Sequence, residues 1–173
     1  MKSELKKKYY VDPGSYGRPS HYPVPPENED LLFYIQRNQN LDTIVYELNH
    51  SSGKVVNRDL PMHAYWIKYS EGGVNQELNH LQNKLAFGYE SREISPDLYV
   101  FNFVSYKELT LYIARQENGR FKVICDIDHQ QAILDHIYVY AVEFGVFPDV
   151  KFIELFGEGI HDGSPLYEKI IIN

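Results

Sequence analysis

The chain has 173 residues, of which 43% are hydrophobic and 24% are charged, as in an ordinary globular domain. Its formal net charge of −7 argues against a general nucleic-acid binder, because such a protein needs a basic face to neutralise phosphates. A single cysteine excludes an intrachain disulfide, and the apolar runs fall short of the roughly 18 residues that a membrane span needs.

Residues 1–28 differ in composition from the rest of the chain. Five of the nine prolines lie there, and because proline fixes φ and lacks a backbone donor, an extended arm is expected. The arm also holds four tyrosines, which indicates docking on the domain or on a partner. Its lysines are expected to be solvated: Lys2, Lys6, Lys7 and Lys8. We therefore divide the chain into this arm and a single β-rich domain over residues 29–173.

The pattern typical of β-strands begins directly after the arm. Residues 31–37 and 43–49 are rich in apolar, β-branched and aromatic side chains, and the polar stretch between them predicts a turn. A further turn and a short edge strand at 54–56 lead to a third long strand over residues 63–69. This third strand, His-Ala-Tyr-Trp-Ile-Lys-Tyr, holds the only tryptophan of the chain, Trp66.

One helix is expected, near residues 75–87. Three leucines recur there at helical spacing and form one apolar stripe: Leu78, Leu81 and Leu85. Asn75 is placed to cap the start of this helix, and Gly88 is placed to end it.

After the helix, the chain predicts consecutive strands separated by turns. The stronger strands span residues 98–104, 109–114, 120–126, 133–144, 150–156 and 166–172. Asn118-Gly119 indicates a hairpin with a type I′ turn, because both residues tolerate φ > 0. Short connections favour antiparallel neighbours. The sequence therefore predicts a mainly β fold, an antiparallel meander of about nine or ten strands that forms a barrel, with a two-sheet sandwich as the alternative.

Catalytic and cofactor-binding motifs are missing from the sequence. It has no glycine-rich phosphate loop and no G-x-S-x-G turn, and its seven histidines lack the spacing of metal-binding pairs. We therefore expect neither a metal nor another cofactor. Cys125 alternates with Phe121 and Val123, which is typical of a small buried hydrophobe rather than a nucleophile.

The strand at 63–69 offers the best candidate for a binding surface. Alternate side chains of a strand share a face, so His63 and Tyr65 lie on one face of this strand and Trp66 lies on the other. If the two preceding strands pair with this one, their tyrosines extend the same surface into an aromatic wall suited to a ligand. The candidate ligand-binding residues are Tyr34, Tyr46, His63, Tyr65 and Tyr69. The alternative is a core of Tyr and His side chains whose polar tips reach its rim.

Three functions from different classes fit these observations. The first is a non-enzymatic binding domain for a small or apolar ligand, or for a protein segment, at the aromatic wall. The second is a hydrolase that pairs a histidine with a carboxylate at the floor of a cleft. Its candidate residues are His63 or His136 with Glu47 or Asp135. The third is a structural or interaction protein that acts through its N-terminal arm.

Four short stretches of the domain resemble those of a known family. They are Thr43–Asn49, His63–Tyr69, Ala86–Tyr89 and Asn102–Tyr106. As a set they resemble an uncharacterised, largely bacterial family of domains of unknown function, from about Leu31 to Ile170. The resemblance implies one autonomous domain and carries over no activity, ligand or catalytic residue.

The same resemblance bears on where the protein is found. Many relatives look exported, with an N-terminal signal or a lipid anchor, and the Lys- and Pro-rich start of this chain departs from that pattern. We therefore expect a cytoplasmic protein, or an exported one if the chain is a processed form.

Overall fold

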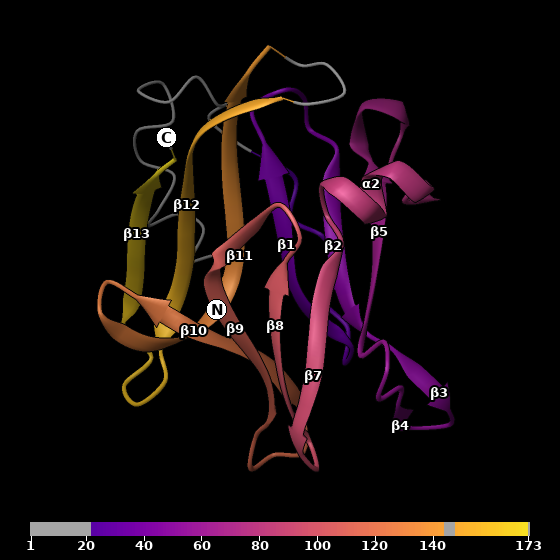
Figure 1. Cartoon of the computed structure of the whole chain (residues 1–173), viewed down its shortest axis with the longest axis vertical. Helices are drawn as coiled ribbons and strands as arrows, with labels where there is room; N and C mark the ends of the chain where they lie inside the picture. The colour runs from indigo at the N-terminus through magenta and orange to yellow at the C-terminus, as the bar shows by residue number, and fades with distance from the viewer. Residues whose placement is uncertain (1–21, 144–147, 173) are drawn as a thin grey trace.

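The computed structural model describes residues 22–143 and 148–172 (Figure 1). Its main strands are β1 (Leu31–Arg37), β2 (Thr43–Leu48), β5 (Met62–Lys68), β6 (Val74–Glu77), β7 (Tyr89–Ser95), β8 (Leu98–Phe103), β9 (Tyr106–Arg115), β10 (Phe121–Ile127), β11 (Gln130–Val142), β12 (Asp149–Gly159) and β13 (Pro165–Ile171). Two short strands, β3 (His50–Ser52) and β4 (Val55–Val56), form a separate hairpin. The helical elements are a 3₁₀ turn, η2 (Tyr69–Glu71), and one α-helix, α2 (His80–Leu85).

The long strand β11 organises the main sheet. Its first half pairs with β10, and its second half pairs with β1 along the same edge, while β12 pairs along the other edge. The sheet thus has two wings, β1-β2-β5-β6 and β10-β9-β8-β7, which curl toward each other into a half-barrel (Figure 1). Helix α2 links β6 to β7 and so joins the outer strands of the two wings.

Tyrosine hydroxyls join the two wings where their backbones do not pair. The Tyr89 hydroxyl donates to the carbonyl oxygen of Met62 at 2.6 Å and accepts from the Met62 amide at 2.8 Å. The hydroxyl of Tyr46 donates to the carbonyl oxygen of Phe87 at 2.6 Å. These side chains therefore complete hydrogen bonds that a closed barrel would make between strands.

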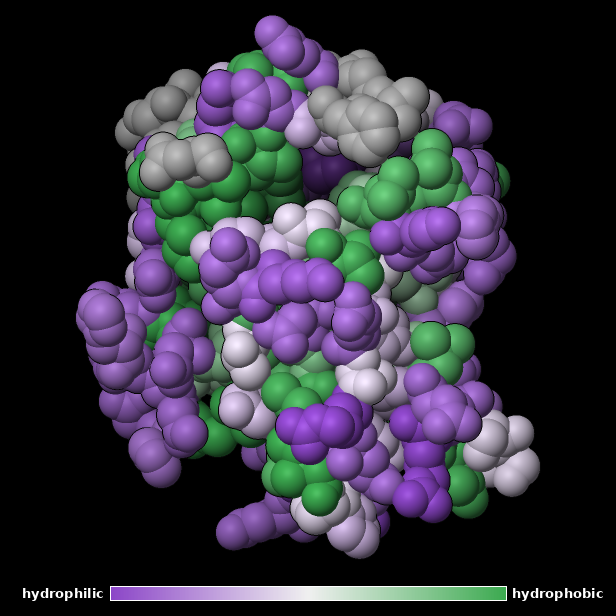
Figure 2. Space-filling model, in the orientation of Figure 1, coloured by the Kyte–Doolittle hydropathy of each residue, from purple (hydrophilic) through white to green (hydrophobic). Residues whose placement is uncertain are grey.

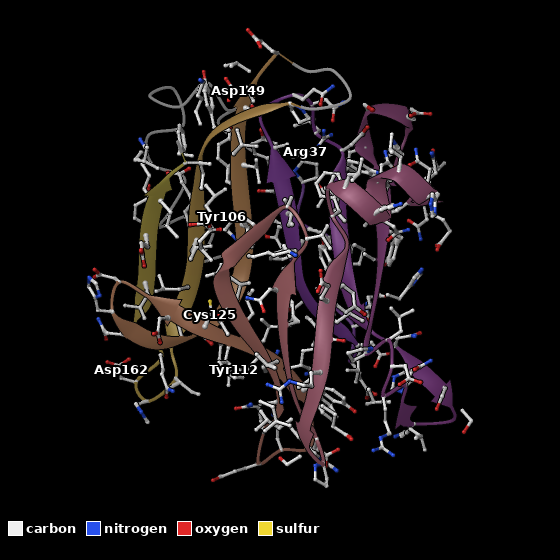
Figure 3. All side chains as sticks on the ribbon, viewed as in Figure 1. Arg37, Tyr106, Tyr112, Cys125, Asp149 and Asp162 are labelled. Atoms are coloured by element: carbon white, nitrogen blue, oxygen red, sulfur yellow. The ribbon has the colours of Figure 1, made fainter. Side chains whose placement is uncertain are left out.

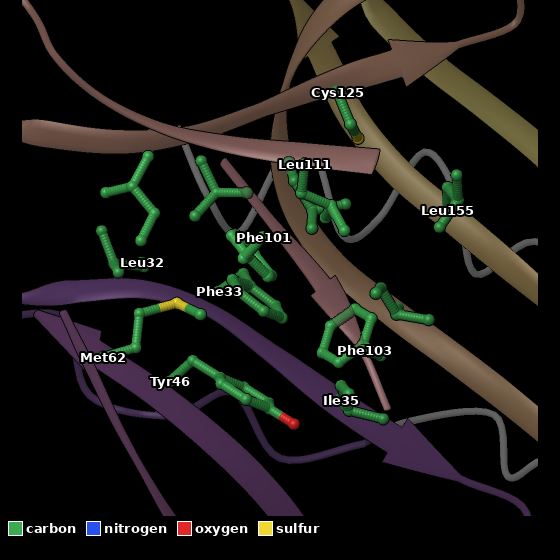
Figure 4. Close-up of a cluster of buried hydrophobic side chains, with 14 of the residues drawn as sticks. Leu32, Phe33, Ile35, Tyr46, Met62, Phe101, Phe103, Leu111, Cys125 and Leu155 are labelled. Carbon is green, nitrogen blue, oxygen red and sulfur yellow. The ribbon is translucent and has the colours of Figure 1, made fainter. Parts of the chain in front are cut away.

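Aromatic rings fill much of the space between the wings (Figure 4). Phe33 of β1 stacks on Tyr46 of β2 with ring centroids 4.5 Å apart. From the opposite wing, the rings of Phe101 and Phe103 pack near Phe33, with centroids 6.3 and 6.1 Å from its centroid. Burial of these rings is the main source of stability on the concave face of the sheet.

The prediction of a mainly β fold with one helix is confirmed, and the curled main sheet forms a half-barrel. There are more strands than expected. In addition, β1 pairs with β11 in parallel, because the second half of β11 extends beyond β10 to the edge of β1. The helix begins only at His80, since residues 74–77 continue as β6 along the edge of β5. Its N-cap is Asn79, which forms a capping box with Gln82, rather than Asn75.

The hairpin expected at Asn118-Gly119 is present, with a different turn. Only Gly119 has positive φ, and a hydrogen bond from its amide to the Gln116 carbonyl forms a three-residue loop. The pair of positive φ values that a two-residue type I′ turn needs lies instead at Asp128 and His129, between β10 and β11.

Of the predicted arm, residues 1–21 lie outside the described residues. The part that is described follows the outer side of β1. The Tyr22 hydroxyl donates to the Arg37 carbonyl oxygen at 2.7 Å, and Gln36 Nε2 donates to the Pro23 carbonyl oxygen at 3.1 Å. Residues 22 and 23 are therefore docked on the sheet.

Candidate functional site

Trp66 links the sheet to helix α2. Its position on β5 points the indole toward the concave side, where it is 3% exposed. The indole Nε1 donates to Gln82 Oε1 at 3.2 Å, and the ring meets Phe87 edge-on at 5.5 Å. A helix of six residues is not stable alone. These contacts therefore stabilise it and hold it over one end of the half-barrel.

Arg37 is the last residue of β1 and lies at the upper end of that strand (Figure 3), where its side chain contacts this tryptophan. Its guanidinium carbon is 4.6 Å from the centroid of the Trp66 ring, within the range of a cation–π interaction. Nη1 donates to Gln39 Oε1 at 2.8 Å, and Nη2 donates to Asn40 Oδ1 at 2.9 Å. The ring and the two amide oxygens therefore fix the plane of the guanidinium.

The charge of Arg37 has no carboxylate partner within 4 Å in the part of the chain that the structure describes. The nearby Asp42 accepts hydrogen bonds from the amide and hydroxyl of Ser70, at 2.9 and 2.7 Å, and lies 3.7 Å from Lys68 Nζ. Burial lowers the pKa of Arg37, while the charge of Asp42 acts in the opposite direction. An arginine side chain nevertheless keeps its proton at any physiological pH.

Helix α2 covers this region with an apolar stripe that is only partly buried. Leu78 lies just before the helix and belongs to the core, at 7% exposed, whereas Leu81 and Leu85 in the helix are 47% and 43% exposed. The predicted stripe of leucines therefore has two functions. One end anchors the segment, and the other forms an apolar wall beside open space.

That open space is a cavity of about 620 Å³ between α2 and the concave side of the sheet. Its apolar lining residues are Ile35, Leu81, Leu85, Ala86, Phe87, Phe103, Leu109, Ile137, Val139, Ala141, Pro148, Val150, Ile153 and Ile172. Its polar lining residues are Arg37, Asn38, Gln39, Asn79, Gln82, Ser105, Tyr106 and Asp149. Figure 2 shows a hollow in the upper half of the molecule with hydrophobic surface on both sides. The arrangement is an apolar chamber with a few polar groups.

A second, smaller hollow of about 300 Å³ lies near Cys125, Tyr112 and Gln131. The Cys125 side chain is 3% exposed, and burial raises the pKa of its thiol to about 12. A thiol with so high a pKa carries almost no thiolate near neutral pH, which fits the predicted role of a small buried hydrophobe.

The expected pairing of the three N-terminal strands is present, but it does not bring all five predicted site residues to one face. Tyr34 pairs with Val45, which in turn pairs with Tyr65. These three side chains belong to a cluster on the outer face, separate from the core on the concave side. Tyr46 points to the concave side instead, into the core. The remaining four share the outer face: Tyr34, Tyr65 and Tyr69 join one cluster, and His63 stacks on Tyr65.

On that outer face the side chains pair mainly with one another. His63 Nε2 and Glu77 Oε1 lie 2.7 Å apart, and the Tyr65 hydroxyl donates to Glu47 Oε2 at 3.0 Å. Tyr34 is fully buried. None of the five predicted residues lines either hollow described above. Their role in ligand binding stays a prediction.

The histidine–carboxylate contact expected for a hydrolase exists at one of the two proposed places. His136 Nδ1 lies 2.6 Å from Asp135 Oδ2. The imidazole is fully buried between the rings of Tyr34 and Phe156, with centroids 5.1 and 4.3 Å away. At the other place, His63 contacts Glu77 rather than Glu47. The His136 pair is thus packed among aromatic rings and lines neither hollow.

Sequence reasoning did not single out Arg37, which the structure places in the cavity lining. Two signals point to it in retrospect. It is a cation at the end of a largely apolar strand, and two of the three predicted leucines are exposed in the helix rather than buried in the core. The sequence gives no indication that these two features meet.

The described residues contain neither a side-chain cluster suited to a metal ion nor a helix suited to spanning a membrane. No group of three or more His, Cys, Asp or Glu side chains within residues 22–143 and 148–172 is arranged to hold a metal ion. Over the same residues, no helix has the length and apolar character that crossing a membrane requires.

These features define a small, mainly β domain with one curled mixed sheet, a short covering helix and an apolar cavity between them. The family model of the Domain of unknown function (DUF4833) matches residues 33–169, and the chain therefore belongs to that family. This confirms the expected resemblance to a family of domains of unknown function. Comparison with curated proteins and with solved structures gave no match.

Proposed function

We propose that this domain binds a small, largely apolar molecule in the cavity between α2 and the concave side of the sheet. The observation that carries the proposal is the cavity itself, whose volume of about 620 Å³ lies within the usual range of small-molecule sites. Its lining is mostly apolar with a few polar groups, which is the composition of such sites.

The leucines of α2 support this proposal. Leu81 and Leu85 line the cavity and are both more than 40% exposed. Removing apolar surface from water stabilises a complex by roughly 25 cal/mol for each Å² buried. A ligand that covers these two side chains therefore gains affinity from surface that the domain leaves exposed.

The titratable residues in the lining also favour binding over catalysis. They are Arg37, Tyr106 and Asp149. Asp149 pairs with Lys151 at 2.7 Å, and burial raises the pKa of Tyr106, so the phenol stays neutral. A nucleophile next to a general base is the arrangement that covalent catalysis needs, and these three residues do not supply it.

The test is binding of a neutral naphthylamine dye, measured by the emission of the dye and by quenching of the fluorescence of Trp66, the only tryptophan. A Val139→Phe variant places a larger side chain in the cavity lining and is expected to weaken dye binding. Val55→Phe is the matched control, because Val55 is 60% exposed on the β3–β4 hairpin. Native mass spectrometry of freshly purified protein checks for a ligand that is already bound.

The proposal fails if the wild-type domain does not bind the dye and purifies without a ligand. It also fails if Val139→Phe unfolds at the wild-type urea midpoint and yet binds the dye as tightly as Val55→Phe does. Either result would mean that the cavity is not the binding site.

A further inference from the structure

We infer that the ligand is an amphiphile with a single carboxylate, which Arg37 binds while the aliphatic part fills the apolar cavity. This inference rests on the function proposed above and adds the chemical class of the ligand. The contacts of Arg37, the balance of charge around it and the division of the lining into polar and apolar parts support it.

The guanidinium of Arg37 has N–H donors that the structure assigns to no acceptor. Of its five N–H donors, the structure assigns one on Nη1 to Gln39 and one on Nη2 to Asn40. Its Nε is buried and makes no hydrogen bond within the described residues. Both partners are neutral amide oxygens, so they leave the positive charge in place. An incoming anion therefore gains a charge-assisted hydrogen bond without breaking an ion pair.

The charged groups around Arg37 leave its guanidinium without a direct carboxylate contact among the described residues, although Asp42 acts on it from farther away. Asp42 and Lys68 balance each other at 3.7 Å, and Asp149 and Lys151 balance each other at 2.7 Å. Of these three cations, only Arg37 has no carboxylate within 4 Å among the described residues. A monoanion matches this single charge, whereas a phosphate monoester would bring close to two negative charges at neutral pH.

The shape of the head-group site also favours a carboxylate. The guanidinium is planar, and Trp66, Gln39 and Asn40 hold it in one orientation. A fixed planar fork matches the planar, two-oxygen geometry of a carboxylate. Because the orientation is set before the ligand arrives, little side-chain entropy is lost on binding.

The rest of the cavity suits the aliphatic part of the ligand. Polar lining residues next to Arg37 in the chain, Asn38 and Gln39, gather at the end of β1. The opposite wing of the sheet contributes the apolar side chains of Phe103 and Leu109, from β8 and β9. An amphiphile satisfies both parts at once, because its head group meets the charge and its chain meets the apolar walls.

The experiment compares dodecanoic acid, 1-dodecanol and dodecyl phosphate as competitors for the neutral dye, below their critical micelle concentrations. Wild-type domain is expected to bind dodecanoate roughly tenfold to hundredfold more tightly than the alcohol, the range for one hydrogen bond to a charged group. Arg37→Gln is expected to abolish this difference, because the carboxylate loses its charged partner. Arg37→Lys should retain part of it, and Arg92→Gln, at an exposed position on β7, should retain all of it.

The outcomes separate this inference from the proposed function. Equal binding of acid and alcohol, or tighter binding of the phosphate, overturns the carboxylate assignment while the cavity remains a binding site. If the wild-type domain does not bind the dye, both the carboxylate assignment and the proposed function are wrong. If Arg37→Gln does not fold, the acid–alcohol comparison in the wild type and in Arg37→Lys decides the question.

Discussion

Replacing Tyr89 with phenylalanine tests whether side-chain hydrogen bonds join the two wings of the sheet. The Tyr89 hydroxyl lies 2.6 Å from the carbonyl oxygen and 2.8 Å from the amide nitrogen of Met62. Met62 is only 1% exposed, so both groups lose their partner when the hydroxyl is removed. Leaving a buried polar group unpaired costs about 1–3 kcal/mol, so we expect a loss of roughly 2–4 kcal/mol after local relaxation.

The assay is urea unfolding followed by the emission of Trp66, with the free energy of unfolding obtained by linear extrapolation. Tyr112→Phe is the matched control, because Tyr112 is 39% exposed and has no hydrogen bond from its hydroxyl in the described part of the chain. Surface changes of this kind usually shift stability by no more than about 0.5 kcal/mol. If the two variants lose equal amounts, the hydroxyl of Tyr89 does not join the wings.

The pH dependence of stability gives a second measurement on the same variant. Burial raises the pKa of Tyr89 above its ordinary value of about 10, against the opposing effect of the Met62 hydrogen bond. Above pH ~10 the unfolded chain therefore releases this proton while the folded chain keeps it, and stability falls as the pH rises. Tyr89→Phe should show a shallower loss of stability than Tyr112→Phe over this alkaline range.

Two further predictions concern Gly88 and Cys125. A Cβ at Gly88 would lie 1.7 Å from the backbone oxygen of Asn83 in α2, so Gly88→Ala should destabilise the domain by about 1–3 kcal/mol or more in urea unfolding. The comparison is Gly163→Ala, where φ is +68° but no atom lies within 4 Å, and a smaller loss at Gly88 would contradict the close approach. Burial raises the pKa of the Cys125 thiol to about 12, so an aromatic disulfide reagent at pH 8 should react only after unfolding. Full modification within minutes in native buffer would show that the thiol is accessible.

Local patterns in the sequence were sufficient to locate most of the strands. Alternation in residues 63–69 correctly separates Trp66 from His63 and Tyr65, because side chains of a strand alternate between faces whatever the strand pairs with. The same reasoning failed for Tyr46. It assumed a register that places Tyr46 beside Tyr34, but the observed register places Val45 there, and a shift of one residue moves a side chain to the other face.

The helix shows the same limit. The leucine spacing predicts helical structure correctly over part of 75–87, but residues 74–77 join the sheet because β5 offers them an unpaired edge. Tertiary contacts of this kind override local preference, since hydrogen bonding along an edge satisfies a whole row of backbone groups. Boundaries that depend on a distant neighbour cannot be read from the local sequence.

By itself the sequence determined the mainly β fold, the approximate position of the helix and the buried character of Trp66 and Cys125. These properties follow from composition and short-range periodicity. The tertiary structure alone decided the parallel pairing of β1 with β11, whose partners Tyr34 and His136 are about a hundred residues apart in the chain. It alone placed Arg37 at the apolar cavity beneath α2. Such juxtapositions depend on how distant strands curl and pair, which no local pattern encodes.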